Sequence, residues 1–273
     1  MLTNTSIESV PALINAVQQG VYGTHPDTLP VVAAFWIRQS TQFPGTQQKY
    51  RNYYLLLRVG ATFGACCVEG DQVDSAVAEQ VSGQSVGTLL RDARLPVRIA
   101  ALDAYLGAAF PHAQASGATA LVLPEGTPIE RAVVRDEAIA SLLPIEAGHR
   151  VGLIGVVNPL IAAIERRGAA CLPCDFNMDR TQDGRTVAKD MMPVLEEADA
   201  VIATGMTLSN GSFDRIVAAA RRRNIPLAIY AQTGSAVAAR FVGRGVSALS
   251  AEPFPFSQFS ADPTAIYLYR AAR

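Results

Sequence analysis

The sequence has little net charge, few cysteines and no long apolar segment. Its 23 Lys and Arg residues nearly balance its 24 Asp and Glu residues, for a net charge of −1. Nucleic acids and anionic membranes attract proteins with a large positive excess, so we expect neither as a partner. No apolar run reaches the ~18 residues of a membrane-spanning helix, and residues 1–10 lack the basic and apolar parts of a signal peptide. Four cysteines in 273 residues are too few for a disulfide scaffold. These absences predict a cytoplasmic protein.

The common catalytic motifs are also missing. The sequence contains no G-x-S-x-G, no H-E-x-x-H and no G-K-[ST] pattern. The three histidines, His25, His112 and His149, lie in no motif, and we expect them at the surface or in linkers. No residue is therefore assigned a catalytic role, and the sequence leaves open whether the protein is an enzyme.

Apolar residues are abundant, at 49% of the chain against 17% charged residues. At about 150 residues per domain, this length makes one large domain or two small ones, with ample material for a core. The pattern changes near residue 115. Within residues 1–113, strand-like runs come first and helical segments follow, which predicts an α+β domain.

Residues 114–273 instead alternate between apolar runs and helical patterns. The runs lie at 118–123, 150–155, 169–174, 200–204 and 225–230, and the helical patterns at 127–143, 159–168, 186–198, 212–223 and 235–242. Continuous apolar strands separated by helices are typical of a parallel sheet that is covered on both faces. We therefore predict a Rossmann-like, doubly wound domain here, and an α/β fold class for the chain.

Ligands of such sheets collect at the carboxyl ends of the strands, near the reversal of strand order. Gly155 ends the second apolar run and Asn158 follows it, without the G-x-G-x-x-G pattern of dinucleotide-binding proteins. Asn158 is expected to cap a helix that begins at Pro159, whose free N–H groups could face an anion, although a cap alone explains it equally well. Asp175 follows the next run, where an acidic residue often binds a ribose hydroxyl.

Two further loops at this edge are rich in small polar residues. They offer compact uncharged donors and acceptors, together with glycines that permit close backbone approach. Simple helix capping remains the alternative for both. The candidate ligand-binding residues are Thr204, Gly205, Thr207, Asn210 and Gly211 in one loop and Thr233, Gly234 and Ser235 in the other.

Cys171 and Cys174 form a C-x-x-C pair, which is half of a zinc site. No second pair follows, and residues three apart on a strand point to opposite faces unless the chain turns at Pro173. Structural thiols are the first interpretation, soft-metal ligands the second and a redox pair the third.

Several segments resemble one known family, the heavy-metal-chelation proteins, whose function is uncertain. They are EEADAVIATGMTLSNGSFDRIV, RVGLIGVVNPLI, YAQTGSAVAARFVGRGVSAL and SGQSVGTLLRDARLPVRIAALDAYLGA, and the resemblance spans about residues 5–260. It implies an enolase-N-like domain at residues 1–113, a Rossmann-like domain at 114–273 and a site in the cleft between them. It also implies that Thr204, Gly205, Thr207, Asn210, Gly211 and residues 233–235 bind the ligand.

The chain departs from this family at two places. Asp103-Ala104 stands where an Asn-Ala pair is common, so an acid replaces an Asn expected to face the ligand. Thr233-Gly234-Ser235 stands where a G-P-S-like turn is typical.

The first functional interpretation is binding of a divalent or heavy metal, a metal chelate or a small anionic metabolite, with a role in metal chelation or metallophore metabolism. The alternative is an enzyme that holds a nucleotide-like cofactor, S-adenosylmethionine or NAD(P), with Asp175 at the ribose. A scaffold with a vestigial pocket is a third interpretation, because a fold alone does not decide function. A homodimer is the default oligomer.

Overall fold

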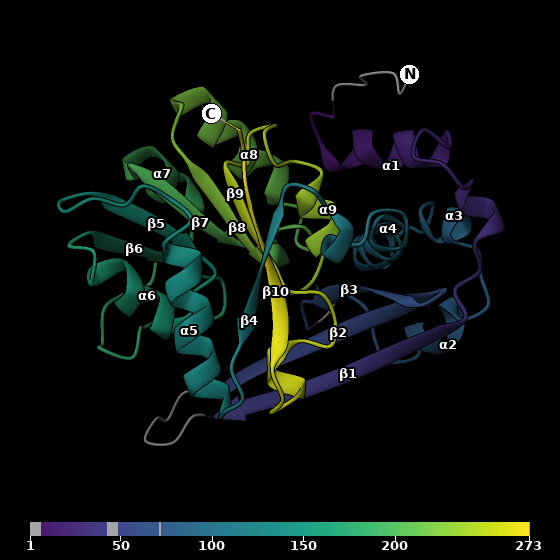
Figure 1. Cartoon of the computed structure of the whole chain (residues 1–273), viewed down its shortest axis with the longest axis horizontal. Coiled ribbons are helices and arrows are strands. Elements are labelled where there is room, and N and C mark those ends of the chain that lie inside the picture. Colours follow the sequence, from purple (N-terminus) through teal and green to yellow (C-terminus); the bar gives the residue numbers. More distant parts are fainter. Residues whose placement is uncertain (1–6, 43–48, 71, 273) are drawn as a thin grey trace.

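The computed structural model describes residues 7–42, 49–70 and 72–272 (Figure 1). It contains two sheets, one of three strands and one of seven. The three-stranded sheet is an antiparallel meander of β1 (Ala33–Gln42), β2 (Lys49–Val59) and β3 (Thr62–Val68). The short turn between β2 and β3 uses Gly60 at φ +57°, a conformation that favours glycine.

One face of the three-stranded sheet is covered by α4 (Leu95–Ala109). A Cβ at Gly64 of β3 would lie 2.0 Å from the backbone nitrogen of Ala104, so only glycine permits this close packing. The smaller helices of this half are α1 (Val10–Gln18), α2 (Val77–Val81) and α3 (Val86–Leu89). Strands therefore precede most of the helices here, as the sequence predicts.

The seven-stranded sheet has the order β4-β10-β9-β8-β7-β5-β6. Five neighbouring strands run parallel: β5 (Arg150–Ile154), β6 (Ala170–Cys174), β7 (Ala200–Thr204), β8 (Leu227–Ala231) and β9 (Ala248–Ala251). The last strand, β10 (Thr264–Arg270), lies antiparallel between β9 and β4 (Ala118–Leu123). The coarse prediction of a mixed α/β fold with a mostly parallel sheet is confirmed.

Two strands and one helix differ from the sequence prediction. β9 and β10 were not predicted, because β9 has only four residues and a proline-containing stretch separates it from β10. The helix expected over 186–198 begins only at α7 (Met191–Glu197), because Thr186 instead bridges Arg180 and Ala188 bridges Cys174 at the edge of the sheet.

Helices cover both faces of the large sheet. One cluster of buried residues includes α5 (Pro128–Ala140) and α6 (Asn158–Glu165). A larger cluster joins α7, α8 (Phe213–Arg223) and α9 (Ser235–Ala239) to α4 and the three-stranded sheet. The two sheets therefore share one core. No helix within the described ranges is long and apolar enough to cross a membrane.

The order of the parallel strands reverses at β5. Counted along the chain from β5, the parallel strands stand in the order 2-1-3-4-5, so consecutive strands move away on either side of β5. Ligands of open α/β sheets bind at the carboxyl ends of the strands at such a reversal, which here is the gap between the ends of β5 and β7.

Candidate functional site

A pocket with a volume of about 650 Å³ lies at this reversal point. One wall comes from β2 and β3 of the small sheet. The opposite wall comes from α5 and from the loops that follow β5, β6, β7, β8 and β9. Pockets of a few hundred Å³ at such positions are typical small-molecule sites.

The two polar loops predicted from the sequence meet in this pocket. Thr204, Gly205 and Thr233 all line it. A Cβ at Gly205 would lie 2.5 Å from the carbonyl oxygen of Thr233, so the loops touch through their backbones and only glycine fits between them.

Gly155 also lines the pocket, in a conformation that requires glycine. Its φ is +85°, and a Cβ would lie 2.5 Å from Cγ2 of Thr204 and 2.9 Å from the Tyr230 hydroxyl oxygen. Tyr230 donates a hydrogen bond of 2.7 Å to the carbonyl oxygen of Gly155. This contact holds the ends of β5 and β8 together across β7.

Asp175 lines the pocket, but both of its oxygens accept backbone hydrogen bonds. Oδ2 accepts from the amide of Val156 at 2.9 Å, and Oδ1 accepts from the amides of Asn177 at 2.8 Å and Met178 at 3.1 Å. The carboxylate therefore fixes the loops after β5 and β6, and few of its lone pairs are left for a ribose.

The prediction that Asn158 caps a helix is wrong, because Val157 occupies the cap position and Asn158 is the first residue of α6. The Asn158 amide instead donates to the Tyr50 hydroxyl at 2.8 Å and accepts from the amide of Gln182 at 3.0 Å. Asn158 does not line the pocket, and it positions Tyr50, which does.

Three residues of the first polar loop also lie outside the pocket lining. Thr207 is buried and donates to the carbonyl oxygen of Thr204 at 2.7 Å. Asn210 accepts from the amide and hydroxyl of Ser212 at 3.1 and 2.6 Å, in a turn that leads into α8. Gly211 has a φ of +76° and faces Leu95. This end of the loop stabilises the structure rather than lining the cavity.

In the second loop, Gly234 and Ser235 are directed into the core. Gly234 donates to the carbonyl oxygen of Ala65 on β3 at 2.9 Å. The hydroxyl of Ser235 lies 3.1 Å from Nε2 of His112, whose Nδ1 lies 2.6 Å from the Tyr269 hydroxyl. His112 was expected at the surface and is buried, and burial lowers its pKa to about 4.

Cys171 and Cys174 pack in two different core clusters on opposite faces of β6. Burial raises the pKa of Cys171 to about 12 and that of Cys174 to about 11. The two thiols do not face a common space. Across the part of the chain that the structure describes, no group of three His, Cys, Asp or Glu side chains is arranged to hold a metal ion.

Asp103, which stands where the family resemblance implies a ligand-facing Asn, does not line the pocket. It is 3% exposed, and it accepts from the amide of Ala65 on β3 at 2.9 Å and from that of Ala236 on α9 at 2.8 Å. Asp103 therefore joins α4, the small sheet and the helix that follows the second polar loop. Burial raises its pKa to about 6, although these backbone hydrogen bonds act in the opposite direction.

The sequence reasoning missed Arg135, the cation that α5 places in the pocket wall. Its side chain is 16% exposed, and its Nε donates to Oδ1 of the buried Asp136 at 2.8 Å. Oε2 of Glu252, also buried, lies 3.8 Å from one terminal nitrogen of Arg135. Neither terminal nitrogen has a hydrogen bond to the described residues. The terminal nitrogens of this mostly buried guanidinium can therefore still donate to a ligand, while Asp136 and Glu252 already offset its charge.

The other missed residues are aromatic and amide side chains beside Arg135. Burial raises the pKa of Tyr54 and of Tyr230, so both hydroxyls stay protonated. Tyr54 donates to Oε1 of Gln39 at 2.9 Å and Tyr230 to the carbonyl oxygen of Gly155, so both hydroxyl oxygens can accept a hydrogen bond from a ligand. Gln232 donates to Oε2 of Glu252 at 3.0 Å and to Oε1 of Gln258 at 2.6 Å. No local motif marks any of these positions, because the tertiary fold alone brings them together.

Fold and pocket together define a mixed α/β protein with a small-molecule-sized cavity at the reversal point of its sheet. Residues 137–251 match the model of the DUF364 family, described as "Putative heavy-metal chelation". Over these residues, the match confirms the resemblance inferred from the sequence.

Two solved structures of DUF364 proteins of unknown function share the fold. That from Desulfitobacterium hafniense is 14% identical with a TM-score of 0.60, covering 95% of this chain and 96% of its own. That from Pyrococcus horikoshii is 13% identical with a TM-score of 0.58, covering 95% and 100% respectively. No curated protein matches the sequence.

Proposed function

We propose that this protein binds a small carboxylate-bearing molecule, free or as a metal chelate, in the pocket between the two sheets. The observation that carries the proposal is the available guanidinium of Arg135, held at Nε by Asp136 and facing the cavity. Planar guanidinium groups bind carboxylates through paired hydrogen bonds, and both terminal nitrogens of Arg135 can still donate such a pair, beyond its contacts with Asp136 and Glu252.

The ligand-binding residues of this proposal are the pocket-lining members of the predicted set, with Arg135 added. The predicted members are Gly155, Asp175, Thr204, Gly205 and Thr233. We further infer an enolase-N-like domain over residues 1–113 and a Rossmann-like domain over 114–273, so that the ligand lies between them. The order of the parallel strands and the position of the pocket support this division.

The available metal-ligating side chains favour a metal chelate over a bare metal ion as the ligand. The described residues offer no cluster of three metal-ligating side chains, and a bare zinc ion normally takes at least that many protein ligands. A chelated metal brings its own ligands and needs only recognition of its carboxylates. The name of the matched family, which refers to heavy-metal chelation, fits such a ligand.

An enzyme with a nucleotide-like cofactor has less support. Its main sequence argument was Asp175 at the ribose, and three backbone amides already occupy the oxygens of that carboxylate. S-adenosylmethionine and NAD(P) therefore serve as negative comparisons in the test below.

Calorimetric titration and thermal melting with citrate, nickel citrate, free Ni²⁺, S-adenosylmethionine and NAD test the proposal. We expect citrate or its nickel complex to raise the melting temperature, since a ligand at 100 times its Kd stabilises by about 2.7 kcal/mol. Arg135→Lys keeps a charge beside Asp136 but removes the paired donors, so affinity should fall at least ~10-fold.

Arg150→Lys is the matched control, because Arg150 is about half exposed and does not line the pocket. A response to free Ni²⁺ alone, or equal affinities of the wild type and Arg135→Lys, would refute carboxylate recognition by Arg135. Stabilisation by S-adenosylmethionine or NAD alone would favour the cofactor-dependent enzyme instead.

A further inference from the structure

The strand β4 leaves one edge of the seven-stranded sheet open. It stands at the end of the strand order and pairs only with β10. Its sequence, ATALVL, has no charged residue, no proline and no glycine, and Thr119, Ala120 and Val122 are exposed. Proteins normally protect such edges with charges, prolines or bulges, because an open flat edge pairs with other strands.

Apolar side chains flank this edge. Of the nine large hydrophobic residues that are exposed among the described ones, four lie on β4 or α5. The four are Val122, which is 60% exposed, Ile129, Val133 and Val134. Val133 and Val134, together with the half-buried Leu121, line a shallow hollow beside α5. A gathering of this kind marks an interaction surface more often than a free one.

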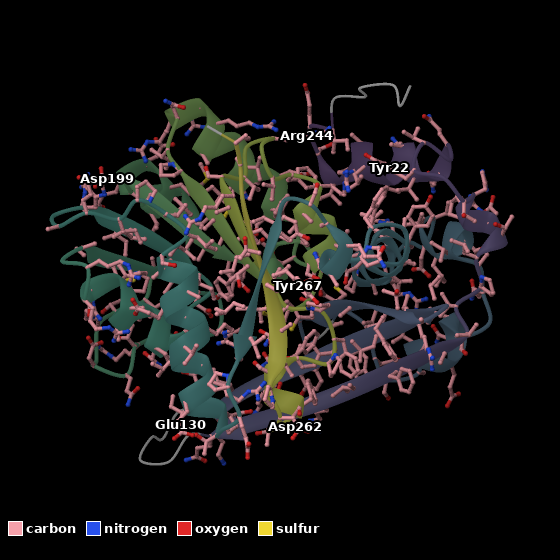
Figure 2. The ribbon with its side chains drawn as sticks, viewed as in Figure 1. Tyr22, Glu130, Asp199, Arg244, Asp262 and Tyr267 are labelled. Carbon is pink, nitrogen blue, oxygen red and sulfur yellow. The ribbon has the colours of Figure 1, made fainter. Side chains whose placement is uncertain are left out.

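The charges around this surface are segregated along α5. Near the N-terminal end of α5 lie the exposed acids Glu125, Glu130 and Asp262, and Figure 2 shows Glu130 and Asp262 at the same end of the molecule. Arg131 joins the two loops at this end, because it donates hydrogen bonds to the carbonyl oxygens of both Pro124 and Asp262.

The C-terminal end of α5 is basic. Arg270 donates to the carbonyl oxygens of Ser141 and Leu142, just after α5, at 2.9 and 2.6 Å. Arg166 and Arg167 lie at the same end, and both pair with Glu137 at 2.7 and 2.6 Å. The basic side chains thus outnumber this acid, and the two ends of the surface carry opposite charge.

We propose that two copies of this chain pair through β4, antiparallel, around a two-fold axis perpendicular to the sheet. An isologous contact must be complementary to itself. An antiparallel strand edge satisfies this requirement, because each copy supplies the donors and acceptors that the other needs. The same axis places the two α5 helices antiparallel, so the acidic end of each lies against the basic end of the other.

Sedimentation velocity at protein concentrations from 1 to about 100 µM tests the pairing. We expect a species of about 58 kDa, twice the 29.0 kDa of the chain. Val122→Lys puts a charge on the apolar edge strand of each copy and should raise the dissociation constant of the dimer at least ~10-fold. Val32→Lys is the matched control, because Val32 is 58% exposed but lies outside β4 and α5, and it should leave the dimer intact.

A second variant, outside β4, distinguishes loss of the interface from local misfolding of β4. Val133→Glu changes only the exposed face of α5 and should also weaken the dimer. Each of Glu125→Arg and Arg166→Glu should raise the dissociation constant of the dimer about 2- to 5-fold, as expected for exposed ion pairs. The variant that carries both substitutions should return to the dissociation constant of the wild type. A wild type that stays monomeric at 100 µM, or a dimer that Val122→Lys and Val32→Lys affect equally, overturns the proposal.

Discussion

Replacing Asp103 with Asn should change how the stability of the protein depends on pH. Asp103 is buried between α4, β3 and α9 and accepts two backbone hydrogen bonds of 2.9 and 2.8 Å. Asn has nearly the same shape but cannot ionise. The substitution therefore separates the cost of burying a charge from the packing of the side chain.

The magnitude follows from the pKa of Asp103, which burial raises from 3.8 to about 6. An acid whose pKa is higher in the folded state than in the unfolded chain favours folding most when both states are protonated. That contribution is full below pH 3.8, declines as the pH rises to about 6 and is absent above it. At 1.36 kcal/mol per pH unit, the decline amounts to about 3 kcal/mol.

The amide introduced by Asp103→Asn keeps one acceptor oxygen but presents an NH₂ group to the second backbone amide, which costs about 1–3 kcal/mol at every pH. We therefore expect Asp103→Asn to be less stable than the wild type near pH 4. Relative to the wild type it should then gain up to about 3 kcal/mol between pH 4 and pH 7, so that the two proteins approach each other or cross.

Urea unfolding at intervals of half a pH unit from pH 4 to pH 7.5 measures this difference directly. Other titrating groups affect both proteins equally and cancel in the comparison. A difference in unfolding free energy that stays constant with pH would show that Asp103 ionises normally in the folded state, and the reasoning about its burial would be wrong.

Two further substitutions test the geometry of the pocket and the start of α5. Gly155→Ala should cost about 1–2 kcal/mol of backbone strain and a further 1–3 kcal/mol of overpacking against Thr204. Gly184 has a similar φ of +87°, but an added Cβ would meet open space, so Gly184→Ala should show the backbone strain alone. If the two variants lost equal amounts of unfolding free energy, the close contact between residue 155 and Thr204 would be contradicted. Thr127→Ala removes the capping box with Glu130 and should lower the unfolding free energy by about 1 kcal/mol. A loss of less than about 0.3 kcal/mol in urea titration, below the usual range for a cap, would mean that this cap is dispensable.

The sequence by itself determined the alternation of apolar runs and helices in residues 114–273, because burial of a strand on both faces requires an uninterrupted apolar segment. It also placed Gly155, Asp175, Thr204, Gly205 and Thr233 at one edge of the sheet, since parallel strands end on the same side. The resemblance to the heavy-metal-chelation family was likewise carried by local motifs.

Only the tertiary structure decided which polar residues face the cavity. Thr207, Asn210 and Ser235 have short uncharged polar side chains, as Thr204 and Thr233 do, yet their hydrogen bonds are directed to the neighbouring backbone or to His112. Arg135 has no local signal, because its partner Glu252 is more than a hundred positions away and its place in the pocket depends on how α5 packs. The family resemblance implies a ligand-facing Asn at the position of Asp103, whereas the packing of α4 against β3 and α9 makes Asp103 an internal anchor. Local patterns fix elements and their ends, but the direction of each side chain depends on contacts between distant segments.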